Sequence, residues 1–316
     1  MTPVMANLLN IVGILVFVVF GAAMLTWVER RVLGIWQDRH GPNRVGPFGT
    51  LQIVADMIKL LVKEDWVPDF SDKFIFVIAP TIAMFVVVAA FAVIPMAPGV
   101  GIVDLNVGLL FFLAMTSLGV YAVMFGAYAS DNKYALIGGI RAAAQMVSYE
   151  VFMGLSLMGV VMLAGSFDLR QVVLSQQDGW YIFPQFIGAF IFMMAGIAES
   201  HRTPFDLPEA EHELTAGFHT EYSGMKFAMF FIGEYVSVLL TSAMITVLFL
   251  GGWLGPDFAP PLFWFLLKTL ILVLFMILIR GSLPRPRYDQ LMSFGWKCML
   301  PLALANLVVT AALILR

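Results

Sequence analysis

The sequence predicts an all-α, polytopic membrane helix bundle. Hydrophobic residues make up 60% of the 316-residue chain, and only 12% of its residues are charged. The mean hydropathy is +0.90, whereas in a soluble domain about a quarter of the residues carry charge. Because 18 basic and 21 acidic residues cannot cover a chain of this size with a hydrated surface, we expect most of the outer surface to face lipid.

Eight apolar segments are long enough to cross a bilayer as helices. A helix needs about 20 residues, each rising about 1.5 Å, to span the hydrocarbon layer of roughly 30 Å. No repeat or low-complexity linker interrupts the sequence, so residues 1–316 are expected to form a single transmembrane domain. The predicted spans lie near residues 7–28, 74–95, 108–129, 141–163, 183–200, 226–250, 262–280 and 299–315.

The basic residues are distributed unevenly between the two ends of these spans. Apart from Arg170, Lys268 and Arg316, the 18 lysines and arginines lie in or beside the loops that follow odd-numbered spans. The positive-inside rule predicts that these loops are cytoplasmic. Both termini are then expected on the opposite, periplasmic side. The cytoplasmic loops would be approximately residues 29–73, 130–140, 201–225 and 281–298.

Polar residues in the first cytoplasmic loop recur at helical spacing. Gln52, Asp56, Lys59 and Lys63 are separated by steps of four, three and four residues, which predicts one polar stripe opposite an apolar face. A helix of this kind lies along the membrane interface rather than across it. Two interpretations remain open: the helix seats the bundle among the lipid headgroups, or it forms one wall of an opening for an amphipathic ligand.

The third cytoplasmic loop is rich in acidic residues. Asp206 followed by Glu209 has the form of a capping box, with Pro208 in the first turn and Gly217 as a stop, which predicts a short acidic helix over residues 207–216. Capping explains part of the acidity, and a solvated acidic face is the alternative to a functional role. The carboxylates concerned are Glu199, Asp206, Glu209, Glu211, Glu213 and Glu221.

Three ionisable residues are predicted inside membrane spans: Glu150 in the fourth, Glu234 in the sixth and Lys268 in the seventh. A charged side chain there costs about 2.5–3.5 kcal/mol even on translocon-insertion scales, so each should face the bundle interior. One interpretation is a structural Glu–Lys pair that specifies helix packing. The other is a proton path, because membrane-embedded carboxylates commonly serve as proton relays.

The residues also exclude several kinds of chemistry. With Cys298 as its single cysteine, the chain can form no internal disulfide, Cys-rich zinc site or four-thiolate iron–sulfur cluster. Its four histidines have no spacing typical of metal ligands, and nucleotide-binding motifs and nucleic-acid-type basic runs are absent. We therefore expect no catalytic residue, metal or redox cofactor in this chain. A self-contained proton-coupled transporter and a structural anchor both remain open at this point.

Six stretches, in order along essentially the whole chain, closely resemble the H subunit of proton-pumping NADH:quinone oxidoreductase, or respiratory complex I. Its mitochondrial counterpart is NADH dehydrogenase subunit 1. Membrane subunits of energy-converting hydrogenases are the nearest rival, but residues 41–46 and 204–211 favour the quinone enzyme. The stretches are residues 29–31 (Glu-Arg-Arg), 41–46 (Gly-Pro-Asn-Arg-Val-Gly), 141–150, 201–211, 221–227 and 284–291.

The resemblance implies a subunit without a redox centre that joins the membrane arm of the complex to its peripheral arm. It would lie in the bacterial cell inner membrane and contact quinone, lipid and complex I subunits of both arms. No nucleic acid is implied. Electrons would come from NADH through FMN and iron–sulfur clusters in partner subunits.

The resemblance also implies roles for individual residues. Quinone reduction, or movement of the anionic or protonated quinone species, would change the charge state of buried carboxylates, and this change would be relayed as proton translocation. The candidates for the quinone chamber are Arg31, Arg39, Asp56, Lys59, Phe230 and Phe231. The candidates for the proton path are Glu150, Glu199, Glu209, Glu211, Glu213, Glu221 and Glu234.

Overall fold

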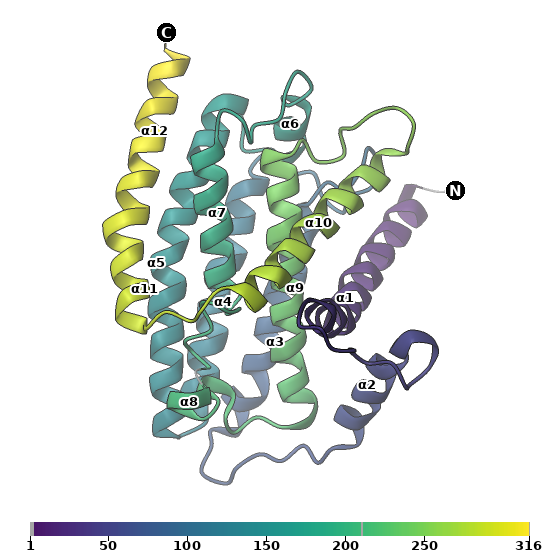
Figure 1. Cartoon of the computed structure of the whole chain (residues 1–316), viewed down its shortest axis with the longest axis vertical. Helices are drawn as coiled ribbons and strands as arrows, with labels where there is room; N and C mark the ends of the chain where they lie inside the picture. The colour runs from purple at the N-terminus through teal and green to yellow at the C-terminus, as the bar shows by residue number, and fades with distance from the viewer. Residues whose placement is uncertain (1–2, 210, 316) are drawn as a thin grey trace.

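The computed structural model describes residues 3–209 and 211–315, with the backbone alone at residues 3, 4, 6, 7, 211 and 212. Within these residues the named elements are all helices, as the composition predicts. Figure 1 shows a bundle of roughly parallel helices that includes α3, α4, α5, α7, α9 and α12, with α1 and α10 crossing it obliquely on one side.

Seven helical segments among the described residues are long and apolar enough to cross a membrane. They correspond to seven of the predicted spans. Their bounds are α1 (Pro3–Trp36), α3 (Lys73–Ala90) with the 3-10 turn η2 (Phe91–Val93), α4 (Gly108–Ala129), α5 (Lys133–Ala164), α9 (Gly224–Phe249), α10 (Pro261–Ser282), and the continuous run of α11 (Tyr288–Phe294), the π-helical η4 (Gly295–Met299) and α12 (Leu300–Ile314).

The predicted span at residues 183–200 is present as a shorter apolar helix, α7 (Phe186–Glu199). Its 14 residues extend about 21 Å at the helical rise, so it is shorter than the seven long helices. The residue before a proline avoids helical geometry, which explains why the helix begins only after Pro184. Gln185 is buried there and binds α12, since it accepts a hydrogen bond from Asn306 at 2.8 Å and donates one to Thr310 at 2.6 Å.

Two helices extend beyond their predicted apolar spans. Helix α1 continues to Trp36, and α5 begins at Lys133, so residues 29–36 and 133–140 are helical rather than loop. Hydropathy marks only the lipid-facing part of a helix, whereas capping decides where the helix ends. The Asn132 side chain accepts a hydrogen bond from the Tyr134 amide at 2.9 Å and so caps α5.

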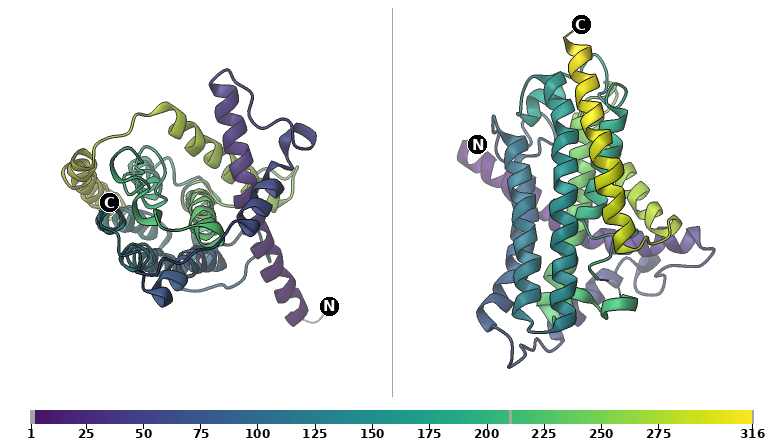
Figure 2. Two further views of the ribbon diagram at one scale, coloured as in Figure 1. Left: turned by 90° about the horizontal axis from the view of Figure 1, so that it is seen from below. Right: turned by 90° about the vertical axis from the view of Figure 1, so that its left-hand side faces the viewer.

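Helix α9 occupies the centre of the bundle. It packs against α1, α3, α7 and α10. Most of its apolar stretch is buried, whereas the corresponding stretches of α1 and α12 are largely exposed. Figure 2 shows α1 leaving the bundle, with its N-terminal half projecting away from the other helices. Residues on α9 can therefore link side chains that α1, α7 and α10 contribute.

The short elements lie mainly at the two ends of the bundle. The turn η1 (Pro47–Gly49) and the predicted amphipathic helix, α2 (Gln52–Val62), lie at the same end as α8 (Glu211–Leu214) and η3 (Gly217–His219), while α6 (Leu169–Leu174) lies at the opposite end (Figure 1). The turn η3 packs closely on α5: a Cβ atom at Gly138 would lie 2.8 Å from the Cα atom of Gly217. Only glycine permits this approach, which brings the acidic loop against the bundle.

Candidate functional site

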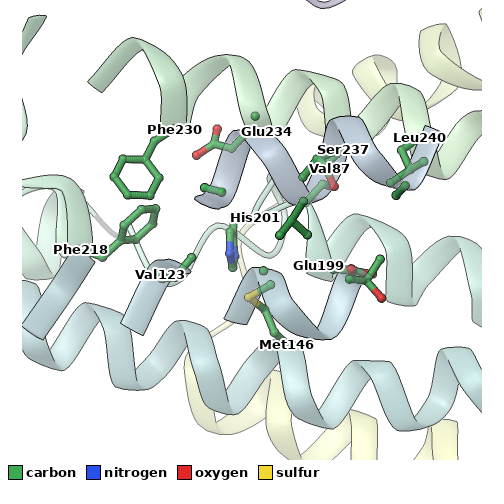
Figure 3. Close-up of a pocket in the computed structure, with 17 residues that line it drawn as sticks. Val87, Val123, Met146, Glu199, His201, Phe218, Phe230, Glu234, Ser237 and Leu240 are labelled. Atoms are coloured by element: carbon green, nitrogen blue, oxygen red, sulfur yellow. The ribbon is translucent and has the colours of Figure 1, made fainter. Parts of the chain in front are cut away.

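Three interior carboxylates come from three different helices. Glu234 lies on α9, Glu199 is the last residue of α7, and Glu150 lies within α5. Glu234 and Glu199 line the same cavity (Figure 3), and Glu199 is close enough to Glu150 for the two to interact electrostatically. Ser117 on α4 donates a hydrogen bond to Glu150 at 2.8 Å. Three candidates for the proton path are therefore neighbours in the fold.

The acidic loop approaches this group at Glu234. Glu209 is partly buried, and both Glu209 and Asp206 interact electrostatically with Glu234. Carboxylates as close as this cannot all be charged without a large repulsion. The acidic loop and α9 therefore contribute to one group of electrostatically interacting carboxylates.

The predicted helix over residues 207–216 is wrong in its extent, because α8 comprises only residues 211–214. The side chain of Asp206 does not cap it. It accepts hydrogen bonds from Arg285 and from the Thr203 hydroxyl, the latter at 3.2 Å. Burial raises the pKa of Asp206, and the Arg285 guanidinium opposes this rise. A charge-assisted hydrogen bond to an arginine is stronger than a neutral one, which explains why the side chain turns to Arg285.

A ladder of alternating charges links Glu234 to α1 and α10. Arg202 lies between two carboxylates, 3.5 Å from Glu234 and 3.7 Å from Glu29, and Arg280 pairs with the other oxygen of Glu29. The side chains of Arg202, Glu29 and Glu234 are at most 12% exposed. The Arg202 guanidinium also lies 3.9 Å from the ring centroid of Tyr235, a cation–π contact. We call Arg280, Glu29, Arg202 and Glu234 the charge ladder.

Three members of the charge ladder, Glu29, Arg202 and Arg280, were not predicted from the sequence as functional residues. Glu29 could have been placed inside the first helix from the sequence, because residues 7–36 contain no proline that would end this helix before Glu29. A helix that continues to Trp36 places Glu29 in its interior rather than in a loop. Which partners Glu29 would meet could not be read from the sequence, because Arg280 follows it by 251 positions.

The remaining loop carboxylates lie nearer the surface. Glu213 is exposed and pairs with Arg141 at 2.7 Å, and Glu221 accepts a hydrogen bond from Asn132 at 2.7 Å. The Glu211 side chain lies outside the part of the chain that the structure describes. Glu213 and Glu221 thus tie the loop to the α4–α5 end of the bundle, at a distance from the interior group at Glu234.

The polar stripe of α2 docks against α1 through Asp56. Arg30 donates to Asp56 at 2.7 Å, Gln52 donates to it at 3.1 Å, and Lys59 lies 3.7 Å away. Partial burial disfavours the charged form of Asp56, but the hydrogen bonds from Arg30 and Gln52 outweigh this effect and lower its pKa. Asp56 is therefore ionised at neutral pH. The opposite face of α2 remains uncovered, with Val54, Ile58, Leu61 and Val62 more than half exposed.

The two arginines predicted near the quinone differ in their surroundings. Arg31 donates to the Phe48 carbonyl at 3.0 Å and to the Pro42 carbonyl at 3.3 Å, and its guanidinium lies 5.7 Å from the ring centroid of Trp27. It therefore holds the loop after α1 in place. Arg39 is exposed and donates to Gln37 at 3.0 Å, so its guanidinium is accessible from the surface.

The predicted pair Phe230 and Phe231 is divided between two environments. Phe230 is buried in the cavity that Glu199 and Glu234 line, and it stacks edge-on against Phe218 and Tyr222. Phe231 lies beside the charge ladder, with its ring centroid 5.8 Å from the Arg202 guanidinium carbon. Consecutive residues on a helix point about 100° apart, which explains the separation.

Lys268 has a structural role, so the interpretation of a Glu–Lys pair is wrong for this residue. Its ammonium donates to the carbonyls of Leu250, Gly252 and Leu254 at 2.7, 3.1 and 2.6 Å. It also lies 4.9 Å from the ring centroid of Trp180. Lys268 thus satisfies the carbonyl of Leu250, the C-cap residue of α9, and two carbonyls of the chain that follows the helix.

Replacing Lys268 with Met is expected to destabilise the protein without changing its chemistry. The substitution leaves the three carbonyls without their donor, at a cost of about 1–3 kcal/mol for an unsatisfied buried group. The measurement is the midpoint of thermal denaturation in detergent, which should fall. Lys133→Met, at an exposed position, is the control. An unchanged midpoint for Lys268→Met would contradict the structural role.

Comparison with known proteins identifies the family. A family model described as NADH dehydrogenase matches residues 9–311. The H subunit of NADH-quinone oxidoreductase from Methylococcus capsulatus is 64% identical over 302 residues, which cover 96% of this chain and 96% of that relative. No group of three or more His, Cys, Asp or Glu side chains that could hold a metal ion occurs among the described residues. The chain therefore belongs to the H-subunit family of NADH-quinone oxidoreductase, as a membrane subunit of that enzyme complex.

Proposed function

We propose that this chain forms part of the chamber in which complex I reduces quinone, and that its buried carboxylates couple this reduction to proton translocation. FMN and iron–sulfur clusters would reside in partner subunits of the peripheral arm, because the single cysteine, Cys298, cannot hold a cluster alone. The membrane-arm subunits would respond to the change in protonation of the interior carboxylates.

The observation that carries the proposal is the position of Glu234. It belongs to the charge ladder, which reaches α1 and α10, and it also lines the cavity that extends to Glu199. Two unit charges 4 Å apart interact by about 4 kcal/mol at an effective dielectric constant of 20. A change in the charge of one member of the ladder would therefore shift the protonation equilibrium of its direct neighbour by a large factor.

The proposed quinone side comprises α1, α2 and α9. The uncovered apolar face of α2 suits a long hydrocarbon tail. Asp56 and Lys59 lie on the polar side of the same helix, where Arg30 of α1 pairs with Asp56. Phe231 on α9 and Arg31 at the end of α1 are the further candidates from this region. Arg39 is a candidate for contact with the polar head or with a neighbouring subunit.

We propose that the end of the bundle that carries α2 and α8 faces the cytoplasm. Both elements lie at the lower end of the bundle in Figure 1, and the C-terminus lies at the opposite end. Seven long helices plus α7 would make eight crossings, which return the chain to the side where it started. The concentration of lysine and arginine in the loops near α2 and α8 supports this orientation, with both termini in the periplasm.

Replacing Asp56 with Asn tests the quinone side of the proposal. The substitution removes the charge that orients Arg30 and Lys59, so the KM for quinone is expected to rise several-fold. The pKa of Asp56 is lowered from the ordinary value of an aspartate, because the hydrogen bonds from Arg30 and Gln52 outweigh the effect of burial. The parent carboxylate therefore stays ionised throughout the working range. The effect should therefore be equal at pH 6 and pH 8. The KM for quinone is measured at pH 6 and at pH 8 from the NADH:quinone reductase activity of membrane vesicles over a range of quinone concentrations.

Asp104→Asn is the matched control for Asp56→Asn. Asp104 forms an exposed pair with Arg170 at 3.0 Å near the periplasmic end, and its loss should leave the KM unchanged. NADH oxidation by a water-soluble acceptor checks that the peripheral arm is intact. If Asp56→Asn assembles and has the parent KM, α2 is an anchor rather than a wall of the chamber. The rival function, a self-contained transporter, would instead show proton-coupled transport by the isolated chain.

A further inference from the structure

An apolar groove of about 300 Å³ lies between α7, α10 and α11. Phe205 and Leu291 form its floor and are at most 5% exposed, whereas Leu283 and Phe294 form its rim and are 49% and 38% exposed. The chain that crosses from the lower end of α10 to α11 in Figure 1 forms one side of the groove. Among the described residues that line it, Gln290 has the one polar side chain.

The wall of the groove suits an apolar occupant. A cavity lined by side chains such as leucine, isoleucine and phenylalanine excludes water and binds hydrocarbon. The groove opens beside α10 and the run of α11 and α12, and both of these segments are long and apolar enough to span a membrane. Their outward sides carry exposed apolar residues such as Phe275 and Leu302. An occupant would therefore enter the groove from the lipid phase.

Basic residues gather in the segment that joins these two spans. Residues 280–297 contain four basic residues and one acidic residue. Two of the basic side chains, those of Arg280 and Arg285, form ion pairs with other parts of the bundle. The other two, those of Arg287 and Lys297, belong to exposed residues. The excess of positive charge favours an anionic partner at this end of the groove.

Arg287 lies beside the groove, because its neighbours Pro286 and Gln290 both line it. Its guanidinium donates to Asp289 from two nitrogens at 3.1 and 3.0 Å, which leaves three of its five N–H donors for another acceptor. The two side chains are 76% and 65% exposed, so their ion pair is weak and open to competition. The Gln290 oxygen accepts from the Arg287 amide at 3.1 Å, which leaves the NH₂ group of Gln290 as a further donor.

We propose that this groove binds an anionic phospholipid of the cytoplasmic leaflet, with an acyl chain in the groove and the phosphate at Arg287 and Gln290. Arginine pairs well with phosphate because its planar fork of donors matches two phosphate oxygens. Basic pockets between membrane helices on the cytoplasmic side bind acidic headgroups in this way. A quinone head carries no phosphate, so Arg287 favours a phospholipid. The inference goes beyond the proposed function and takes from it only the orientation of the bundle.

The position of the groove gives the bound lipid a structural role. Ile197 lines the groove and also lines a small void that Glu29, Arg202 and Arg280 share. An acyl chain in the groove therefore covers the outer side of the charge ladder and keeps water from it. Charges interact more strongly where water is excluded. Loss of the lipid should thus weaken the ladder and lower the stability of the chain within the complex.

Photocrosslinking in native membranes identifies the occupant. Benzoylphenylalanine is placed at Phe294, on the rim of the groove, and mass spectrometry identifies what the assembled complex captures on irradiation. The control places it at Phe275, which is 47% exposed on α10 and does not line the groove. Phospholipid is expected at both positions. The share of phosphatidylglycerol and cardiolipin should be at least threefold higher at Phe294.

Two pairs of variants test the headgroup and the acyl chain separately. Arg287→Gln removes the phosphate donor, and Arg170→Gln is its matched control, because it breaks a similar exposed ion pair at the opposite end of the bundle. Leu283→Trp fills the groove at its rim, whereas Leu283→Met keeps its volume and polarity. Native mass spectrometry of the purified complex counts the retained phosphatidylglycerol. Arg287→Gln and Leu283→Trp should each retain at least threefold less than the parent, and both controls should match it.

The effect on stability is measured by returning lipid to the delipidated complex. Phosphatidylglycerol should raise the temperature at which the parent complex loses this chain, and phosphatidylcholine should not. In Arg287→Gln the two lipids should act alike.

Capture of quinone or of another protein at Phe294 overturns the lipid site. Equal shares of acidic lipid at Phe294 and Phe275 overturn the role of the headgroup, and so does full retention of phosphatidylglycerol by Arg287→Gln. Full retention by an assembled Leu283→Trp complex overturns the place given to the acyl chain. None of these measurements depends on proton pumping or quinone reduction, so the proposed function can fail while the lipid site stands.

Discussion

Glu234→Gln is expected to reduce NADH-driven proton pumping at least tenfold in a complex that still assembles. Glutamine keeps the size of the side chain but cannot bind or release a proton. Among the residues that the structure describes, Glu234 is the only member of the charge ladder that also lines the cavity it shares with Glu199. Loss of its titration therefore interrupts the path at the point where the two features meet. Proton uptake and quinone reduction in inverted membrane vesicles measure the effect.

Two further variants test whether the loss of pumping is specific to Glu234. Glu213→Gln changes an exposed carboxylate paired with Arg141 at 2.7 Å, so its effect should be smaller than that of Glu234→Gln. Asp104→Asn, at the opposite end of the bundle, should have no effect. NADH oxidation by a water-soluble acceptor should be normal in all three. A Glu234→Gln complex that assembles and pumps at the parent rate would show that this carboxylate is structural.

Arg202→Met is expected to produce the largest loss of stability. The guanidinium lies between Glu29 and Glu234, and all three side chains are at most 12% exposed. Removing one member of a buried ion pair leaves an uncompensated charge and typically costs about 3–5 kcal/mol. The change also removes the contact with the Tyr235 ring. The temperature at which the detergent-solubilised complex loses this chain should therefore fall markedly.

A double variant distinguishes the loss of charge balance from the loss of packing. Arg202→Met leaves two carboxylates for one remaining arginine, Arg280. Adding Glu234→Gln removes the carboxylate that has lost its partner and keeps the pair between Glu29 and Arg280, so the double variant should be more stable than Arg202→Met alone. Arg170→Met, which breaks an exposed ion pair, is the matched control and should cost little. If Arg202→Met and Arg170→Met are equally stable, the charge ladder contributes nothing to the fold.

The fold class and the amphipathic helix could be predicted because both depend on local sequence. A span is recognised by its own apolar residues, and α2 by polar residues three and four positions apart. The predicted ends of helices were wrong where local hydropathy does not determine the length of the helix. Pro184 shortens α7, and Asn132 starts α5 before its apolar segment begins. The prediction of an acidic helix that begins at residue 207 was wrong because the Asp206 side chain binds Arg285 instead of capping that helix.

The candidate carboxylates were found from sequence because a charge inside an apolar segment is conspicuous in itself, as Glu150 and Glu234 are. The partners of these carboxylates could not be found in this way, because the partners come from distant parts of the chain. Lys268 illustrates the difference: its place in a span predicted a buried partner, and the fold supplies backbone carbonyls rather than a glutamate.

Hydropathy and helical spacing are properties of neighbouring residues, so they were enough to predict a helical membrane bundle with an interfacial helix and embedded carboxylates. Which charged side chains meet depends instead on how distant parts of the chain fold together. Glu29, Arg202, Glu234 and Arg280 come from α1, the loop after α7, α9 and α10. Their pairing follows from how the helices cross around α9.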